Sequence, residues 1–322
     1  MLYPCAQGKQ AGSGMLNSAY PLLLLTTLFW GGNAVAGKLA IGHISPLALT
    51  SLRWVVALAI LLPFALKPLR RDWPEIKKHL PLLGILGVVG FTCFNAIMYS
   101  ALLWTSAVNV SIEQAAIPLV IIVVNFLVFR AKTTWLQLAG FLLSILGVGL
   151  TASHGDLARL TALDINLGDL LMLIAVLAYG LYTVALRFKP KIHWLSMITV
   201  LVAAALVSSF PLLAWEYASD NLVLPDLTGW VIVMYVSLMP SVLSQVFYIR
   251  GNELIGANRA GLFVNLVPIF GTLLSIVILG EEFHLYHATA LALVICGIWL
   301  AEYSGRKSEA ALARVRAPVD GS

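Results

Sequence analysis

The sequence predicts an all-α integral membrane protein of ten transmembrane helices, arranged as two inverted five-helix repeats. Its composition is the first reason: 60% of the residues are hydrophobic and only 11% are charged, with a mean hydropathy of +0.91. A soluble domain has about 45–50% apolar and about 25% charged residues. The number of long apolar runs and a repeat within the sequence are the second and third reasons.

Ten apolar runs are long enough to cross the hydrocarbon core, which requires roughly 20 residues. In chain order they cover residues 20–41, 45–66, 80–101, 108–129, 135–152, 167–186, 195–217, 228–249, 259–279 and 284–303. The hydrophilic stretches between them are all too short for a soluble domain. We therefore expect each run to form one membrane-spanning helix.

The two halves of the chain resemble each other at a nearly constant offset. Trp30-Gly31, Val35-Ala36 and Lys38 are followed 149 residues later by Tyr179-Gly180, Val184-Ala185 and Arg187, and Tyr99 by Tyr248. After a slip of one residue, matches of Ala, Pro, Leu, Ile and Gly continue: Ala107, Pro118, Leu143, Ile145, Gly147 and Leu150 with Ala257, Pro268, Leu293, Ile295, Gly297 and Leu300. This pattern indicates an internal duplication.

The runs divide the chain into five parts. We expect a cytoplasmic N-terminal tail at 1–17, a first five-helix repeat at 18–152, an external linker at 153–166, a second repeat at 167–303 and a disordered, basic cytoplasmic tail at 304–322. Residues 1–14 lack the apolar core of a signal peptide. Met15 directly precedes the first span, so Met1 and Met15 are both candidates for the native start.

The distribution of basic residues predicts the orientation in the membrane. With both termini in the cytoplasm, Lys38 and Arg159 lie outside, Arg53 lies within the second span, and the other 17 of the 20 Lys and Arg residues lie inside. Positive charge favours the cytoplasmic side, so we expect a multi-pass protein of the cytoplasmic (inner) membrane. Because each half has five spans, the second half is inverted, an arrangement that favours alternating access.

Three ionisable side chains qualify as candidates for groups embedded in the hydrocarbon core: Lys38, Arg53 and Glu113. Such groups cost about 2.5–3.5 kcal/mol or more in the hydrocarbon core and therefore face a cavity or a partner. Glu113 is a candidate to carry a coupling proton or hold a substrate ammonium, and Lys38 to bind a carboxylate. The alternative is a structural ion pair of Glu113 with Lys38 or with Arg53.

Neutral polar and aromatic side chains in the spans supply the remaining candidates for a substrate cavity. They are Trp30, Asn33, Asn95, Tyr99, Gln114, Tyr179, Tyr182, Gln245, Tyr248 and Asn265. Asn95 and Tyr99 are four residues apart and so share a helix face. The alternative role for each is helix–helix contact, since interhelical polar contacts are common in membranes.

Two prolines, Pro118 and Pro268, occupy equivalent mid-span positions of the fourth and ninth helices. Each removes one backbone hydrogen bond, so both are hinge candidates, with plain packing kinks as the alternative.

Several enzyme and metal classes lack their motifs. The chain has no Gly-x4-Gly-Lys-Ser/Thr loop and no His-Glu-x-x-His helix, and its three cysteines are scattered. Glu281, Glu282, His284 and His287 are close in sequence; they suggest either a zinc or pH-sensing site or solvated acids beside interfacial histidines. We expect no enzyme activity, no cofactor, no bound metal and no nucleic-acid partner.

Short motifs in chain order resemble the EamA domain of the drug/metabolite transporter superfamily. They are Phe29-Trp30-Gly31-Gly32-Asn33 with Lys38, Ser45-Pro46 with Leu52-Arg53, Tyr99-Ser100-Ala101-Leu102, Ser106-Ala107, Ile117-Pro118, Pro268, Leu279-Gly280-Glu281 and Gly297. The resemblance covers residues 18–303. It implies a ten-helix inverted-repeat carrier of small metabolites or drugs, with a cavity lined by helices 1, 3, 4, 6, 8 and 9. One departure is that Arg130-Ala131-Lys132 stands where the first half would carry Gly-Glu.

We therefore expect a secondary transporter that moves small polar metabolites, amino-acid-like compounds above all, with export favoured. An uptake permease for a nucleobase, vitamin or similar metabolite is one alternative, and a non-transporting scaffold or receptor is the other. The expected partners are a small-molecule substrate, the lipid bilayer and a coupling proton or other ion. Substrate identity and oligomeric state stay open.

Overall fold

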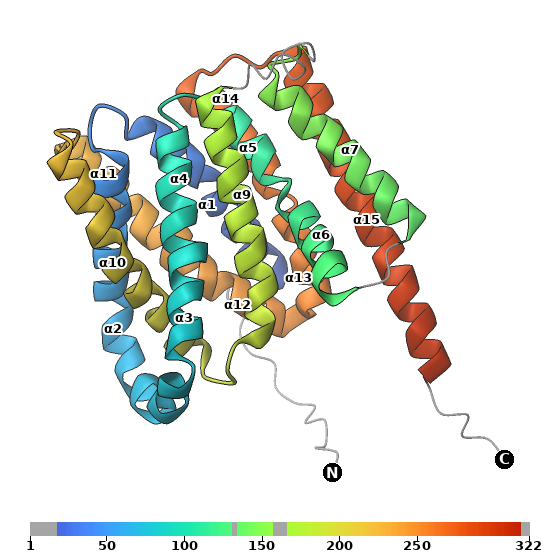
Figure 1. Cartoon of the computed structure of the whole chain (residues 1–322), viewed down its shortest axis with the longest axis horizontal. Helices are drawn as coiled ribbons and strands as arrows, with labels where there is room; N and C mark the ends of the chain where they lie inside the picture. The colour runs from blue at the N-terminus through green and yellow to red at the C-terminus, as the bar shows by residue number, and fades with distance from the viewer. Residues whose placement is uncertain (1–17, 131–133, 157–165, 317–322) are drawn as a thin grey trace.

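The structure is a computed structural model that describes residues 18–130, 134–156 and 166–316. In these residues every regular element is a helix (Figure 1). The predicted tail at 1–17, residues 131 and 132 of the Arg130-Ala131-Lys132 segment and most of the predicted linker, including Arg159, lie outside them.

Among the described residues, the first half contains seven α-helices: α1 (Ala19–Leu39), α2 (Pro46–Lys78), α3 (Leu80–Gly87), α4 (Phe94–Ala101), α5 (Ala107–Gln114), α6 (Ile117–Phe129) and α7 (Trp135–Ala152). The second half also contains seven: α9 (Leu167–Ala185), α10 (Trp194–Ala218), α11 (Leu227–Leu238), α12 (Ser244–Ile255), α13 (Ala257–Val264), α14 (Val267–Leu279) and α15 (Leu285–Arg316). One π-helical turn, Val88–Cys93, joins α3 to α4, and another, Met239–Leu243, joins α11 to α12.

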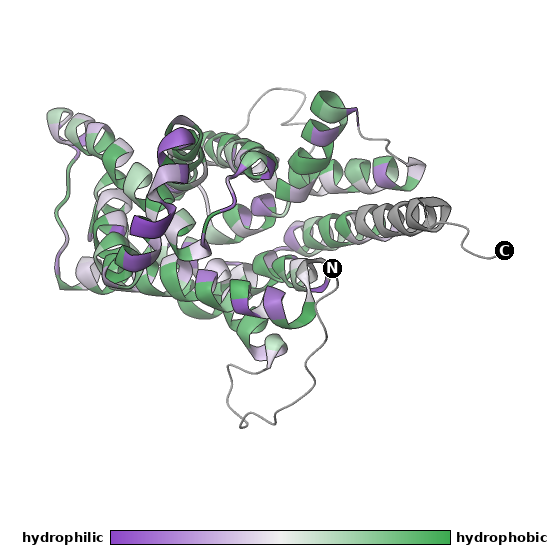
Figure 2. Cartoon of the chain, turned by 90° about the horizontal axis from the view of Figure 1, so that it is seen from below, coloured by the Kyte–Doolittle hydropathy of each residue, from purple (hydrophilic) through white to green (hydrophobic). Residues whose placement is uncertain are grey.

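These elements form the predicted crossings. In the described part of the chain, eight helical segments are long and apolar enough to cross a membrane, and the shorter apolar helices Val267–Leu279 and Leu285–Leu300 lie at the predicted ninth and tenth spans. Bulky hydrophobic side chains such as Trp135 (86% exposed) and Val277 (79%) lie on the outside, and hydrophobic residues run along most helices (Figure 2). A surface this apolar fits lipid.

Helices far apart in sequence pack in pairs. The largest contacts are between α7 and α15, α2 and α10, α4 and α9, and between α1 and both α12 and α14. The α7–α15 pair lies at one side of the bundle (Figure 1). A Cβ on Gly147 would lie 2.7 Å from the carbonyl oxygen of Ala290, so glycine permits this close approach.

The equivalent helices α2 and α10 cap each other. The Glu216 carboxylate, near the end of α10, accepts hydrogen bonds from the backbone N–H groups of Leu47 (3.1 Å) and Ala48 (2.9 Å) at the start of α2. Conversely, Asp72 in α2 accepts one from the N–H of His193, the N-cap of α10, at 2.8 Å. Both carboxylates satisfy N–H groups that a helix start leaves free.

The fourth and ninth crossings are each broken into two helices. α5 ends at Gln114 and α6 begins at Ile117, with Pro118 second; α13 ends at Val264 and α14 begins at Val267, with Pro268 second. Proline fits the first turn of a helix because its N–H is not needed there. Both prolines thus begin a new helix instead of kinking a continuous one.

Two predicted boundaries are too short. α2 continues twelve residues past position 66 to Lys78, and α15 continues through the predicted disordered tail to Arg316. Residues 309–313 are Glu-Ala-Ala-Leu-Ala, all strong helix formers. Composition identified the apolar part of each helix but not its polar extension.

Candidate functional site

A buried arginine is the centre of a polar cluster between the helices. Arg53, on α2, is 4% exposed. Its Nη1 donates hydrogen bonds to Asn33 Oδ1 (3.1 Å), Asn95 Oδ1 (2.5 Å) and Tyr99 Oη (2.6 Å). Its Nε donates to Ser241 Oγ at 2.7 Å. Arg53 therefore joins α1, α2 and α4 to the π-helical turn of the second half, and three of its partners are predicted cavity residues.

The partners of Arg53 are themselves held in place. The Tyr99 hydroxyl donates to Asn33 Oδ1 at 2.9 Å. The Ser241 hydroxyl donates to the carbonyl oxygen of Val236 at 2.7 Å, so its oxygen is left to accept from Arg53. These bonds fix the acceptors around the guanidinium group.

The charge of Arg53 has no counter-ion within the cluster. All four acceptors are neutral, and no carboxylate of the described residues forms an ion pair with it. Within the same part of the chain, Nη2 makes no hydrogen bond, and the Trp54 ring centroid lies 4.8 Å from the guanidinium carbon. A buried cation without an anion is costly, and a guanidinium binds a carboxylate through paired N–H groups.

Aromatic rings lead away from Arg53 in a continuous series. Centroid distances are 5.3 Å from Trp54 to Phe91, 5.9 Å from Phe91 to Tyr182, 5.3 Å from Tyr182 to Tyr179 and 4.8 Å from Tyr179 to Phe94. The predicted residues Tyr179 and Tyr182 thus lie in an aromatic wall that begins beside the guanidinium group.

The two predicted tyrosines differ in their surroundings. Tyr182 is buried against Gly90, where a Cβ would clash with its ring. Tyr179 is only half-buried. Packing therefore explains Tyr182, whereas Tyr179 keeps an accessible surface.

A second aromatic pair comes from opposite halves of the chain. The rings of Trp30 and Tyr248, both predicted cavity residues, lie 5.4 Å apart. Trp30 Nε1 also donates to the carbonyl oxygen of Pro240 at 3.2 Å. This pair links α1 to α12 and to the same π-helical turn that carries Ser241.

The other predicted neutral residues lie outside the Arg53 cluster. Gln114 donates to the carbonyl oxygen of Val110 on its own helix at 3.4 Å. Gln245, on α12, is half-buried, as is Asn265, which lies between α13 and α14.

The predicted ion pairs of Glu113 with Lys38 or Arg53 are wrong. Lys38 Nζ donates instead to the carbonyl oxygens of Leu102 (2.8 Å) and Thr105 (2.7 Å). Carbonyl groups at a helix end lack partners and attract cations, which explains this choice. Glu113 is 0% exposed, and its carboxyl oxygens accept no hydrogen bond from the described residues.

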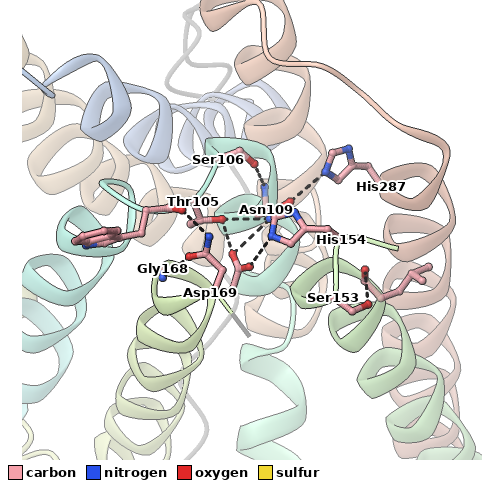
Figure 3. Close-up of polar contacts among 11 residues, drawn as sticks. Thr105, Ser106, Asn109, Ser153, His154, Gly168, Asp169 and His287 are labelled. Atoms are coloured by element: carbon pink, nitrogen blue, oxygen red, sulfur yellow. Dashed lines mark hydrogen bonds and ion pairs between the residues drawn. The ribbon is translucent and has the colours of Figure 1, made fainter. Parts of the chain in front are cut away.

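A second polar cluster surrounds Asp169, in the first turn of α9 (Figure 3). Asp169 is 0% exposed. Its Oδ1 accepts hydrogen bonds from the Thr105 hydroxyl and from Asn109 Nδ2, the latter at 3.4 Å, and its Oδ2 lies 3.3 Å from His154 Nε2. The charges of Asp169 and Glu113 are close enough to interact.

Asp169 is missing from the predicted set of membrane-embedded ionisable residues. An acid in the first turn of a span also suits an ordinary, solvent-facing helix start, so its sequence signal is ambiguous. Gly168 explains the burial. A Cβ there would lie 2.6 Å from the carbonyl oxygen of Ala101 and 2.8 Å from the amide nitrogen of Thr105, so glycine lets the start of α9 press against the α4–α5 loop.

Of the acids and histidines of the 281–287 segment, Glu282 and His284 are exposed, in line with one of the two expectations, whereas Glu281 and His287 are not. Glu281 is not a free surface acid, because it accepts hydrogen bonds from the N–H groups of Ala107 and Val108, both at 2.8 Å. His287 is 3% exposed, with Nε2 3.0 Å from Asn109 Oδ1. The described residues contain no group of three or more His, Cys, Asp or Glu that could hold a metal ion.

An exposed histidine–aspartate pair lies outside the spans. Asp226, the N-cap of α11, accepts from the N–H of Gly229 at 2.7 Å and lies 2.7 Å from His43 Nδ1. The Gly229 N–H foremost, and then His43, hold the pKa of Asp226 below its ordinary value. Its side chain is 55% exposed, in contrast to that of Asp169.

Comparison with known proteins identifies relatives along nearly the whole chain. The profile of the EamA-like transporter family matches residues 17–153 and again residues 166–303. The two matches correspond to the two halves of the internal repeat.

Individual relatives are described as transporters. The uncharacterized transporter YyaM of Bacillus subtilis (strain 168) is 25% identical, over 88% of this chain and 92% of its own. The uncharacterized transporter YetK of the same organism is also 25% identical, over 94% and 93%. The uncharacterized inner membrane transporter YicL of Salmonella typhimurium is 24% identical, over 91% and 96%.

A solved structure has the same fold. It is a crystal structure with a TM-score of 0.61 at 20% sequence identity, covering 90% of this chain and 98% of its own. At this level of identity the likeness concerns the fold alone.

Proposed function

This chain belongs to the EamA-like transporter family, and from that membership we propose that it is a secondary carrier of small polar metabolites that works by alternating access. The membership and the apolar helices make it a multi-pass membrane transporter. The mechanism, substrate class and direction argued below are the proposal.

The proposed location is the cytoplasmic membrane, with both termini in the cytoplasm. This follows from the excess of Lys and Arg in the loops at one end of the bundle. The other end, with the loops at 40–45, 102–106 and 280–284, lies at the top of Figure 1 and is the external end. The Asp169 cluster then lies near the outside and the aromatic wall deeper.

The observation that carries the proposal is Arg53, a buried cation with no counter-ion. Charged groups inside membrane proteins occur where a substrate, an ion path or a partner requires them. The four neutral acceptors hold the guanidinium group in place without cancelling its charge. A substrate carboxylate supplies the missing anion, so the favoured substrates are amino-acid-like compounds.

Glu113 supplies the coupling group of the proposed carrier. An isolated ionised carboxylate is very unfavourable in a buried site, and Glu113 has no hydrogen-bond partner among the described residues. Its neutral, protonated form suits that environment. Loss of the proton would have to accompany a change in its surroundings, which is how a coupling carboxyl links protonation to conformation.

The broken crossings supply the moving parts. The breaks before Pro118 and Pro268 occur at equivalent places in two inverted repeats. An inverted pair of flexible points lets one half adopt the packing of the other, which opens the site first to one side and then to the other. Both prolines are therefore the proposed hinges.

The test compares small molecules in spent medium and inside cells that overexpress the wild type, Arg53→Gln or Arg250→Gln. Arg250 is an exposed residue paired with Glu253 at 2.9 Å, so its replacement makes the same chemical change away from the site. Membrane levels of all three proteins are measured in parallel.

We expect a carboxylate-bearing compound to accumulate outside cells with the wild type and with Arg250→Gln but not with Arg53→Gln. Selective depletion from the medium would instead establish uptake and reverse the proposed direction. Identical profiles for all three proteins, each present in the membrane, would contradict the carrier proposal and favour a scaffold or receptor.

A further inference from the structure

A series of polar side chains connects the external surface to Asp169 (Figure 3). It starts at a cavity of about 210 Å³ whose lining includes Asn109, His154 and His287. His154 is 35% exposed, and its Nε2 lies 3.3 Å from the fully buried Asp169 Oδ2. Asn109 joins the second histidine to the same carboxylate, because its Oδ1 lies 3.0 Å from His287 Nε2 and its Nδ2 contacts Asp169.

The series ends beside an unpaired carboxyl group. Glu113 is four residues after Asn109 on α5, so both side chains project from the same helix face. Both Glu113 oxygens are buried without a hydrogen-bond partner among the described residues, and the Asp169 carboxyl group lies within electrostatic range of Glu113. A buried, unsatisfied acid beside such a series of polar contacts needs a reason of its own.

We propose that Thr105, Asn109, His154, Asp169 and His287 form the external proton entrance of the carrier and that Glu113 receives the proton. The proposal deepens the carrier function and rests on it. The ligand of the site is a proton from external water. His154 takes up this proton and passes it to the Asp169 carboxylate, which then protonates the Glu113 carboxylate. Each donor regains a proton from the group before it, and His154 regains one from external water.

The residues of the proposed proton entrance have different roles. His154 is the accessible member, and an imidazole ring has two nitrogens, one of which can accept a proton while the other donates one. Asp169 is the buried relay, held by the Thr105 hydroxyl and Asn109. Asn109 also binds His287 and therefore fixes the second histidine against the relay.

Other charged groups face this entrance and set its electrostatics. Glu282 and His284 line the cavity, 3.3 Å apart, and Tyr286 completes its wall. Glu281 also lines the cavity, and its carboxylate accepts a hydrogen bond from the backbone N–H of Ala107 at the start of α5. Lys38 donates to the carbonyl oxygen of Thr105 behind the cluster. The nearby acids favour proton capture from the outside.

The test is infrared spectroscopy of the purified full-length protein in lipid bilayers, without added substrate. A protonated carboxyl group has a C=O stretching band distinct from that of a carboxylate, and deuterium exchange shifts it. We compare the rate of that shift after a change from H₂O to D₂O in the wild type, Asp169→Asn and His154→Gln. Glu113→Gln identifies the band, and Asp220→Asn, on the turn after α10 at the same end of the bundle, is the matched control.

We expect a protonated band in the wild type that disappears in Glu113→Gln. Its exchange should slow by about 100-fold in Asp169→Asn, in line with the usual contribution of a positioned proton-transfer group, and less in His154→Gln. Asp220→Asn should exchange like the wild type.

Unchanged exchange in both Asp169→Asn and His154→Gln would overturn the proposal, as would the absence of a protonated band that depends on Glu113. If Asp169→Asn does not fold, His154→Gln decides alone, because His154 is partly exposed. No substrate is present, so these outcomes are independent of whether the carrier proposal holds.

Discussion

The two buried polar clusters of the molecule differ in charge and in what surrounds that charge. Around Arg53, one cation has four neutral acceptors and no anion. Around Asp169, one carboxyl group has hydroxyl, amide and histidine partners, and a second, that of Glu113, lies within electrostatic range without a hydrogen-bond partner among the described residues. The first lacks a negative charge, and the second has more acids than fixed cations.

This difference assigns the clusters to different ligands. A fixed guanidinium group with a free N–H edge suits a carboxylate, whereas an acid beside histidines suits a proton that comes and goes. The proposed carrier needs both a substrate site and a coupling site, and we propose that the two sites differ in the sign of their charge. Each prediction below tests whether the two clusters have separate roles.

The largest expected effect is the loss of carboxylate binding in Arg53→Gln. One lost charge-assisted hydrogen bond is worth about 1.5–3 kcal/mol, so the affinity should fall by about 10- to 100-fold or more. Binding of a mixture of ¹⁴C-labelled L-amino acids to the purified protein measures it. Arg53→Lys should restore only part, because an ammonium lacks the planar fork of a guanidinium. Full affinity in Arg53→Gln would remove the substrate role.

Glu113→Gln should abolish the response to a pH gradient. For one proton per substrate, a gradient of one pH unit is worth about 1.4 kcal/mol, or a tenfold accumulation. Proteoliposomes with the wild type should approach that ratio for the ¹⁴C-labelled L-amino acid mixture, and those with Glu113→Gln should show none. Retained accumulation in the variant would place the coupling group elsewhere.

Tyr99→Phe should weaken substrate binding without eliminating it. The change removes one acceptor of Arg53 and the hydroxyl that donates to Asn33, while the ring still packs. The change loosens the placement of the guanidinium group but keeps its charge, so we expect an affinity only about 2- to 10-fold lower in the same binding assay, equivalent to about 0.5–1.5 kcal/mol. The pH response should stay intact, because the Asp169 cluster is untouched. A lost pH response with normal affinity would mean that the clusters are not separate.

The smallest effect is expected at the exposed histidine–aspartate pair of His43 and Asp226. This pair is compared with His154 and the buried Asp169. Because the pKa of Asp226 is lowered in the folded protein, its carboxylate stabilises the fold above its ordinary pKa of about 3.9. That contribution disappears as the pH falls through the lowered value.

Asp226→Asn should therefore unfold at a slightly lower temperature than the wild type at pH 7, and the difference should shrink below about pH 4. Thermal unfolding in detergent at several pH values measures this. The pH response of transport should not change. A transport defect as large as that of Asp169→Asn would show that burial does not distinguish the two pairs.

The membrane crossings could be predicted from the sequence, but the contacts between the helices could not. Apolar runs of about 20 residues place the helices because lipid requires them, and the polar residues Asn33, Asn95 and Tyr99 were evident within those runs. Arg53 is also evident as a membrane-embedded charge, but the alternative that pairs it with Glu113 is wrong. Its neutral partner Ser241 comes from a π-helical turn in the other half, and no local pattern predicts that meeting.

Asp169 was missed for a related reason. Its burial depends on Gly168, which lets α9 approach the α4–α5 loop, and this requires knowledge of which helices are neighbours. Likewise, the role of Glu281 on the start of α5 depends on the packing of the ninth crossing against the fourth. Local sequence determines the depth of such residues in the membrane, and tertiary packing determines their partners.

Counterflow in proteoliposomes tests the separation of the two clusters most directly. Vesicles are preloaded with unlabelled L-amino acids and diluted into the ¹⁴C-labelled mixture at equal pH on both sides, for the wild type, Arg53→Gln and Glu113→Gln. The separation predicts exchange in the wild type and in Glu113→Gln but not in Arg53→Gln. Exchange by Arg53→Gln at the wild-type rate, or its loss in Glu113→Gln alone, would contradict it.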